Sequence, residues 1–132
     1  MRRRVLLLAL LALPALLGPA AAERLLIPMD RAQPNHLKAY GLAFWALARG
    51  LSVEWLLNYR CGAFMMEYEQ EAQREAQIRG VGSERISEAD AASIYARIDA
   101  GNMEVVRLEK APRIAVYTPP NALPWDDAVT MA

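Results

Sequence analysis

The side chains best suited to chemistry follow three apolar runs of the sequence, at residues 24–27, 51–57 and 112–117. Each run predicts a strand. In open α/β sheets, ligands collect beyond the carboxyl ends of the strands. We therefore expect a ligand-binding site among the polar residues that come after these runs. The candidates are Asp30, Asn35, His36, Asn58, Arg60 and Asn121.

Each candidate also has a purely structural interpretation. Asp30 could act as a general base, but an aspartate directly after a strand is commonly a turn residue. His36 lies in the first turn of a predicted helix, where burial and the helix dipole disfavour the imidazolium, so a neutral hydrogen-bonding role competes with catalysis. Arg60 with Asn58 could bind an anion or lie solvated in a loop, and Asn35 is placed to cap the helix.

Cys61, His36 and Glu54 supply the residue types of a cysteine, histidine and carboxylate triad. A nucleophile elbow, however, needs small residues on both sides of the nucleophile, and Arg60 precedes Cys61. The pattern favours an inert thiol, and it leaves open whether the protein is an enzyme. The sequence has no paired His or Cys at zinc-ligand spacing, no GxGxxG, no P-loop and no HExxH, so we predict neither a metal nor a cofactor.

Residues 1–22 have the three regions of a secretory signal peptide. Three arginines at positions 2–4 precede an apolar run from Val5 to Leu17, and small residues follow up to Ala22. The run is shorter than the roughly 20 residues of a membrane-spanning helix. We expect cleavage after Ala22, export to the periplasm or the medium, and membrane contact only through the signal peptide.

The part from Glu23 onward has the size and charge of one small acidic domain. It keeps twelve basic and fifteen acidic residues, a formal charge of −3, which argues against nucleic acid as the partner. Its roughly 110 residues can bury a modest core. Cys61 is the single cysteine, so no disulfide within the chain is possible.

The order of elements predicts a parallel sheet. A strand at 24–27, a helix that starts after Asn35 and ends at Gly50, and a strand at 51–57 form a βαβ unit. We expect the apolar, buried face of that helix to contain Leu37, Tyr40, Phe44, Leu47 and Ala48, widened by Leu42 and Trp45. The predicted fold class is a small Rossmann-like or flavodoxin-like α/β domain, a parallel sheet with flanking helices.

The second half of the chain predicts a surface helix over 67–79, a short edge strand over 83–86 and a helix that a capping box opens at Ser87. Residues 103–110 fit strand and helix equally well. A strand at 112–117 and a helix from Trp125 follow, and because this last helix has no C-terminal cap we expect a chain truncated at its C-terminus. The predicted organisation is a signal peptide (1–22), an α/β domain (23–111) and the start of a second α/β half or a continuation of the first (112–132).

Four phrases carry a resemblance to a known group, at residues 26–30, 35–41, 55–60 and 114–120. With them the chain resembles the N-terminal part of exported bacterial proteins commonly labelled asparagine synthetase B, which are similar to glutamine amidotransferases or flavodoxins in fold. The chemistry of that label does not transfer. A glutamine-dependent synthetase needs an N-terminal cysteine and an ATP-binding loop of the SGGxDS type, whereas Arg2 is the second residue and no such loop occurs.

The sequence thus predicts an exported α/β protein that binds a small molecule or a protein partner at its strand-end loops. The alternative is a hydrolase or an amidotransferase-like enzyme whose catalytic residues lie partly beyond residue 132.

Overall fold

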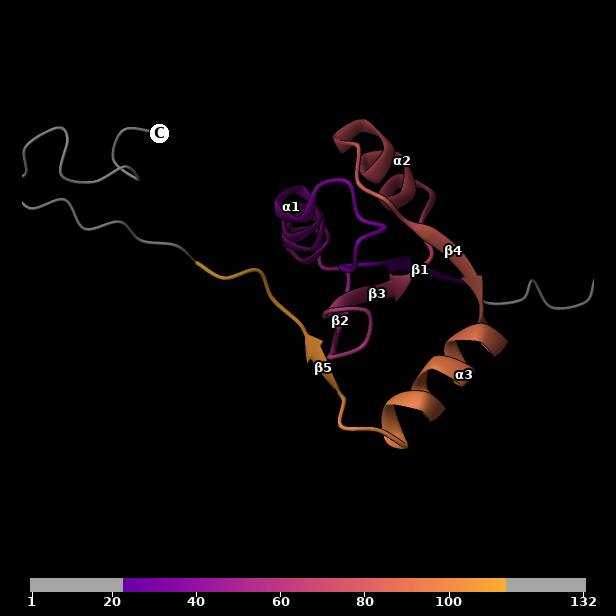
Figure 1. The fold of residues 1–132 in the computed structure, drawn as a ribbon. Coiled ribbons are helices and arrows are strands. Elements are labelled where there is room, and N and C mark those ends of the chain that lie inside the picture. The colour runs from indigo at the N-terminus through magenta and orange to yellow at the C-terminus, as the bar shows by residue number, and fades with distance from the viewer. Residues whose placement is uncertain (1–22, 114–132) are drawn as a thin grey trace, which may run out of the picture.

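A five-stranded antiparallel sheet forms the middle layer of residues 23–113, the part of the chain that the structure, a computed structural model, describes (Figure 1). The helices flank it, with α1 and α2 on one face and α3 on the other. Across the sheet the strands are β4 (Glu84–Ser87), β1 (Glu23–Ile27), β3 (Ala63–Glu67), β2 (Val53–Leu57) and β5 (Glu104–Leu108). The helices are α1 (His36–Ala48), α2 (Gln70–Arg79) and α3 (Glu88–Asp99).

The prediction of a parallel, Rossmann-like or flavodoxin-like sheet is wrong. β1 and β2 do run in the same direction, but β3 lies between them and pairs antiparallel with both. No strand was expected at residues 63–67, where β3 forms. A five-residue loop, 58–62, turns β2 directly back into β3, and this hairpin forces the antiparallel arrangement.

The hairpin loop has an unusual backbone. Asn58, Arg60 and Cys61 have φ angles of 63°, 45° and 63°, in the left-handed region that side chains disfavour. Gly62 follows with φ 90°, and a Cβ there would lie 3.1 Å from Nε1 of Trp55. The carbonyl of Tyr59 accepts hydrogen bonds from the amides of Gly62 and Ala63, at 2.9 and 3.0 Å. These two hydrogen bonds stabilise the tight turn and offset part of its backbone strain.

The first six elements have the β-α-β-β-α-β order of the split βαβ, or ferredoxin-like, motif. β1 and β2 flank β3, while β3 and β4 flank β1, so the two units interlock. The last two elements extend this motif. α3 packs across the second face of the sheet, and β5 pairs with β2 as a new edge strand.

Alternating side chains of the strands divide the core into two clusters. Leu25, Ile27 and Phe64 pack beneath α1 and α2. Leu26 and Met65 point to the opposite face, where they meet α3. None of the helices within residues 23–113 is long and apolar enough to cross a membrane.

Several local predictions are confirmed. Oδ1 of Asn35 accepts a hydrogen bond from the Lys38 amide at 3.0 Å and caps α1. Ser87 and Asp90 form the expected capping box at the start of α3. Within the ambiguous stretch 103–110, the strand β5 forms. Of the strand predicted at 112–117, residues 112 and 113 are described and do not belong to a strand. The rest of it and the predicted helix from Trp125 lie outside the described residues.

A buried glutamine joins two loop segments on the α1 side. Gln33 is only 4 % exposed, and its Nε2 donates hydrogen bonds to the carbonyls of Pro28 and Gly82, at 2.9 and 3.1 Å. Its Oε1 accepts a hydrogen bond from the Gly82 amide at 2.8 Å. The side chain thus ties the segment after β1 to the segment before β4.

Gln33→Ala is expected to lower the free energy of unfolding by about 3 kcal/mol, because it leaves buried backbone groups without partners. Urea denaturation of the chain from Glu23 onward measures this loss. Gln77→Ala, at an exposed position of α2, is the matched control and should change stability by less than about 0.5 kcal/mol. Equal effects of the two substitutions would contradict the structural role of Gln33.

Candidate functional site

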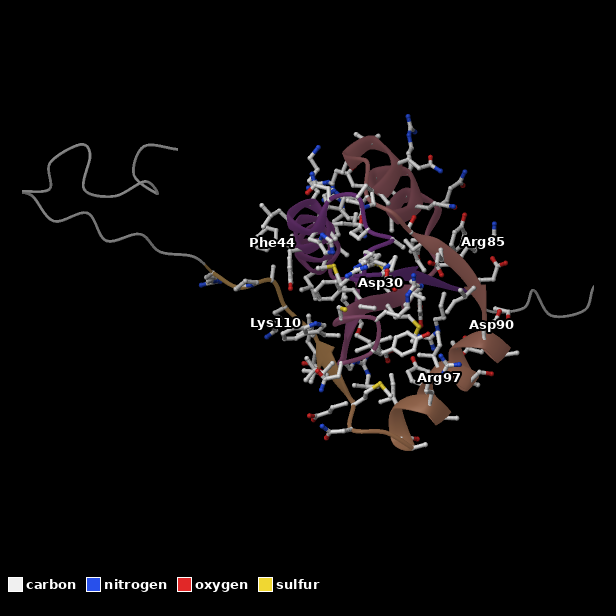
Figure 2. All side chains as sticks on the ribbon, viewed as in Figure 1. Asp30, Phe44, Arg85, Asp90, Arg97 and Lys110 are labelled. Carbon is white, nitrogen blue, oxygen red and sulfur yellow. The ribbon has the colours of Figure 1, made fainter. Side chains whose placement is uncertain are left out.

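Three charged side chains meet at the end of the sheet where β1 and β2 finish. Nε of Arg60 donates to Oδ2 of Asp30 at 2.6 Å, and its Nη1 donates to Oε1 of Glu84 at 2.8 Å. A weaker bond of 3.4 Å joins Nη2 to Oδ1 of Asp30. Together with His36 they form what we call the strand-end cluster. Asp30 lies at the centre of the view in Figure 2.

The neighbours of the cluster are hydrogen-bonded into the fold. Nε2 of His36 lies 3.1 Å from the carbonyl oxygen of Met29 and 3.2 Å from that of Asp30. Because carbonyl oxygens only accept, Nε2 must carry the ring proton. Oδ1 of Asp30 also accepts from the Ala32 amide at 3.0 Å, in an Asx turn. The structure therefore brings Asp30, His36 and Arg60 together and gives each of them a bonding partner.

The remaining predicted site residues are dispersed. Asn35 uses its side chain to cap α1, and Nδ2 of Asn58 donates to the carbonyl of Asn102 at 3.1 Å, on the β5 side of the sheet end. Asn121 lies outside the described residues. Cys61 is exposed and free.

Glu54 does not join Cys61 and His36 in a triad. It faces α3, where its carboxylate accepts a short hydrogen bond from the hydroxyl of Tyr95. Burial, followed by this bond, raises the pKa of the Tyr95 hydroxyl. The carboxylate of the expected triad is therefore engaged by α3.

The strand-end cluster carries more negative than positive charge, because Asp30 and Glu84 both pair with Arg60. The Arg60 guanidinium, through its hydrogen bond, holds the pKa of the Asp30 carboxyl below its usual value. Two carboxylates face this one guanidinium, so an incoming anion would have to displace at least one of them. The main role of the cluster is structural, because the ion pair between Arg60 and Asp30 connects the strained hairpin loop to the segment after β1. We call this ion pair the clasp.

A second candidate site is an apolar groove between α1 and the β2 and β5 side of the sheet. Its volume is about 420 Å³. Phe64, only 3 % exposed, forms part of it and contacts two other aromatic rings. The ring of Tyr40 meets Phe64 edge-on at 5.5 Å between centroids, and the ring of Trp55 stacks on it at 6.1 Å. The groove is lined by Tyr40, Ala43, Phe44, Leu47, Trp55, Phe64, Leu108, Lys110 and Pro112.

The rim of this groove is an apolar stripe on α1 that nothing in residues 23–113 covers. Tyr40 is 49 % exposed and Phe44 43 %. Leu37, one turn earlier on the same stripe, is 84 % exposed. Figure 2 shows Phe44 on α1 and Lys110 beyond β5 on the same side of the molecule. Exposed aromatic side chains beside an apolar groove are typical of a binding surface.

The expectation that Leu37, Tyr40 and Phe44 are buried is therefore wrong. α1 is apolar on more than one face. Its buried residues are Ala39, Leu42, Ala43, Trp45, Ala46 and Leu47, so Leu47 is buried as expected. Small side chains let the helix lie close to the sheet, which turns the aromatic stripe outward. The groove was not expected from the sequence, because Tyr40 and Phe44 were predicted to share one apolar face with Leu42 and Trp45, which are buried.

Among residues 23–113 no group of three or more His, Cys, Asp or Glu side chains is arranged to hold a metal ion. Comparison of the chain with protein-family models, with curated proteins and with solved structures found no match. The class of protein is therefore defined by the geometry itself, a ferredoxin-like sheet with an added helix and strand and an open apolar groove.

The clasp predicts a pH dependence. Because the pKa of Asp30 is lowered in the folded state, its contribution to stability is complete above the unfolded pKa of about 3.9 and is lost as the pH falls through the folded value. Arg60→Gln is expected to raise the Asp30 pKa toward about 3.9, as measured by NMR titration of the carboxyl group.

Arg97→Gln is the matched control for this titration. Arg97 is exposed on α3, on the opposite face of the sheet, and its replacement removes the same charge (Figure 2). The Asp30 pKa should not change in this variant. Equal shifts in both variants would mean that net charge, rather than the Arg60 contact, controls the Asp30 carboxyl.

Proposed function

We propose that residues 23–113 form a docking domain that binds an apolar segment of protein in the groove between α1 and β5. One observation carries this proposal: Tyr40 and Phe44 stand about half exposed at the rim of a groove whose floor is also aromatic. Aromatic side chains provide much contact area at low entropic cost, and they dominate the energetics of protein interfaces.

The lining favours a protein segment over a small polar ligand. Sites for small molecules combine an apolar wall with a few convergent polar groups. Here the polar groups of the lining side chains are the Tyr40 hydroxyl, the Trp55 indole NH and the Lys110 ammonium. The indole NH is already occupied, because Nε1 of Trp55 donates to the carbonyl of Gly62 at 3.1 Å. An apolar side chain fits this surface better than a polar substrate does.

The strand-end cluster is the second candidate site, as expected from the sequence. The observation that favours it is the left-handed backbone at Asn58, Arg60 and Cys61, because such strain is often retained for function. We place it second because Arg60 already forms ion pairs with Asp30 and Glu84, which a bound anion would have to displace. A hydrolase or amidotransferase-like activity stays an alternative that requires catalytic groups from outside residues 23–113.

Photo-crosslinking tests the docking proposal in cells that make the protein. With p-benzoylphenylalanine in place of Phe44, irradiation is expected to give a covalent product with a protein segment, because the probe would lie inside the interface. Mass spectrometry of the digested product identifies the segment, whether it belongs to the same chain or to another.

The same probe in place of Leu37 is the matched control. Leu37 is on the same helix and more exposed, but it does not line the groove. We expect a far lower yield at this position. If the two positions give the same yield, or if position 44 gives no product with protein, the groove is not a docking site.

Export of the protein is also part of the proposal. The sequence of residues 1–22 supports it, and cleavage after Ala22 would preserve the sheet, since the carbonyl of Glu23 accepts a hydrogen bond from the Tyr68 amide at 2.9 Å. Intact-mass measurement of the exported chain should give a protein that begins at Glu23. A chain that still begins at Met1 would contradict cleavage.

A further inference from the structure

We infer that the segment bound in the groove belongs to this same chain and consists of residues 114–125. The inference rests on the proposed docking function and names its partner. Two observations support it: the place where the described chain leaves the fold, and the composition of the residues that follow. A physical argument, the high effective concentration of a covalently connected segment, adds to them.

The chain leaves the described structure at the groove itself. After β5 ends at Leu108, both Lys110 and Pro112 line the groove. Ile114 is only two residues beyond Pro112, a reach of at most about 7 Å in extended chain. The first apolar residue of the following segment is thus within reach of the groove without any long linker.

The composition of the segment matches the surface. Residues 114–125 contain no charged side chain, while Asp126 and Asp127 follow directly. The apolar side chains of this stretch are Ile114, Val116, Tyr117, Leu123 and Trp125, besides alanines and prolines. An uncharged segment can enter a groove of aromatic and aliphatic side chains without burying an unpaired charge.

The covalent connection decides between this segment and a segment of another molecule. A short linker gives an effective concentration in the millimolar range. A groove of modest size and affinity is then filled by its own chain, whereas a second copy at micromolar concentration would compete poorly. The docked segment would cover Tyr40 and Phe44 and would fix the start of whatever structure follows residue 113 against α1.

Hydrogen exchange followed by mass spectrometry tests the inference on the chain from Glu23 to Ala132. If residues 114–117 dock in the groove, their amides are protected in the unmodified protein. Phe44→Glu introduces a charge into the groove and should speed their exchange about tenfold or more. Phe44→Ala, which only removes contact area, should have a smaller effect in the same direction.

Leu37→Glu is the matched control, since it adds the same charge on the same stripe of α1 outside the groove. It should leave the exchange of residues 114–117 unchanged. Unchanged protection of β1 and β3 in every variant shows that the sheet remains folded.

Two results would overturn the inference. The first is exchange of residues 114–117 that is unprotected in the unmodified chain or is insensitive to Phe44→Glu. The second is protection that increases with protein concentration, which would point to a second copy. The photo-crosslink at position 44 separates this failure from failure of the docking proposal. A product with another chain overturns only the intramolecular partner, and the absence of any product overturns both.

Discussion

The position of β3 between β1 and β2 is the constraint on which the rest of the structure depends. Both neighbouring strands form their hydrogen-bonded ladders with it. Its side chains also supply both cores, because Phe64 and Met66 point toward α1 and α2 while Ala63 and Met65 point toward α3. The hairpin loop that sets this position is left-handed at three residues with side chains, a strain that the two ladders and two cores offset.

The same geometry creates both candidate sites. Because β3 begins where β1 ends, the hairpin loop lies beside the segment after β1, and Arg60 reaches Asp30. On the other side, β5 widens the sheet beyond β2. The groove opens between that added strand and α1, and Phe64 and Trp55 contribute to its lining. The ion pair of Arg60 with Asp30 and the open apolar groove beside α1 thus both follow from the same strand order.

α1 connects the fold to the proposed function because it is apolar on two faces. Its alanines pack on the sheet, and its aromatic residues face the groove. A helix that is apolar on most of its circumference is stable in a soluble protein only when something covers the second face. The uncharged stretch that begins two residues past Pro112 fits that role in composition and reach.

Most of the local elements could be predicted from the sequence alone, with β3 as the exception. Asn35 and the pair Ser87 and Asp90 marked the helix starts. The sequence also placed Asp30 and Arg60 at the same end of the sheet. These signals act over a few residues, so they can be read without the fold.

The strand order, the antiparallel direction and the buried face of α1 depend on tertiary contacts rather than on local patterns. Strand pairing depends on contacts between distant segments, and the run of β3 carries no local sign of which strands it will join. Likewise, the spacing of Tyr40 and Phe44 shows that they share a face of the helix, but whether that face or the alanine face meets the sheet depends on how closely the two can pack.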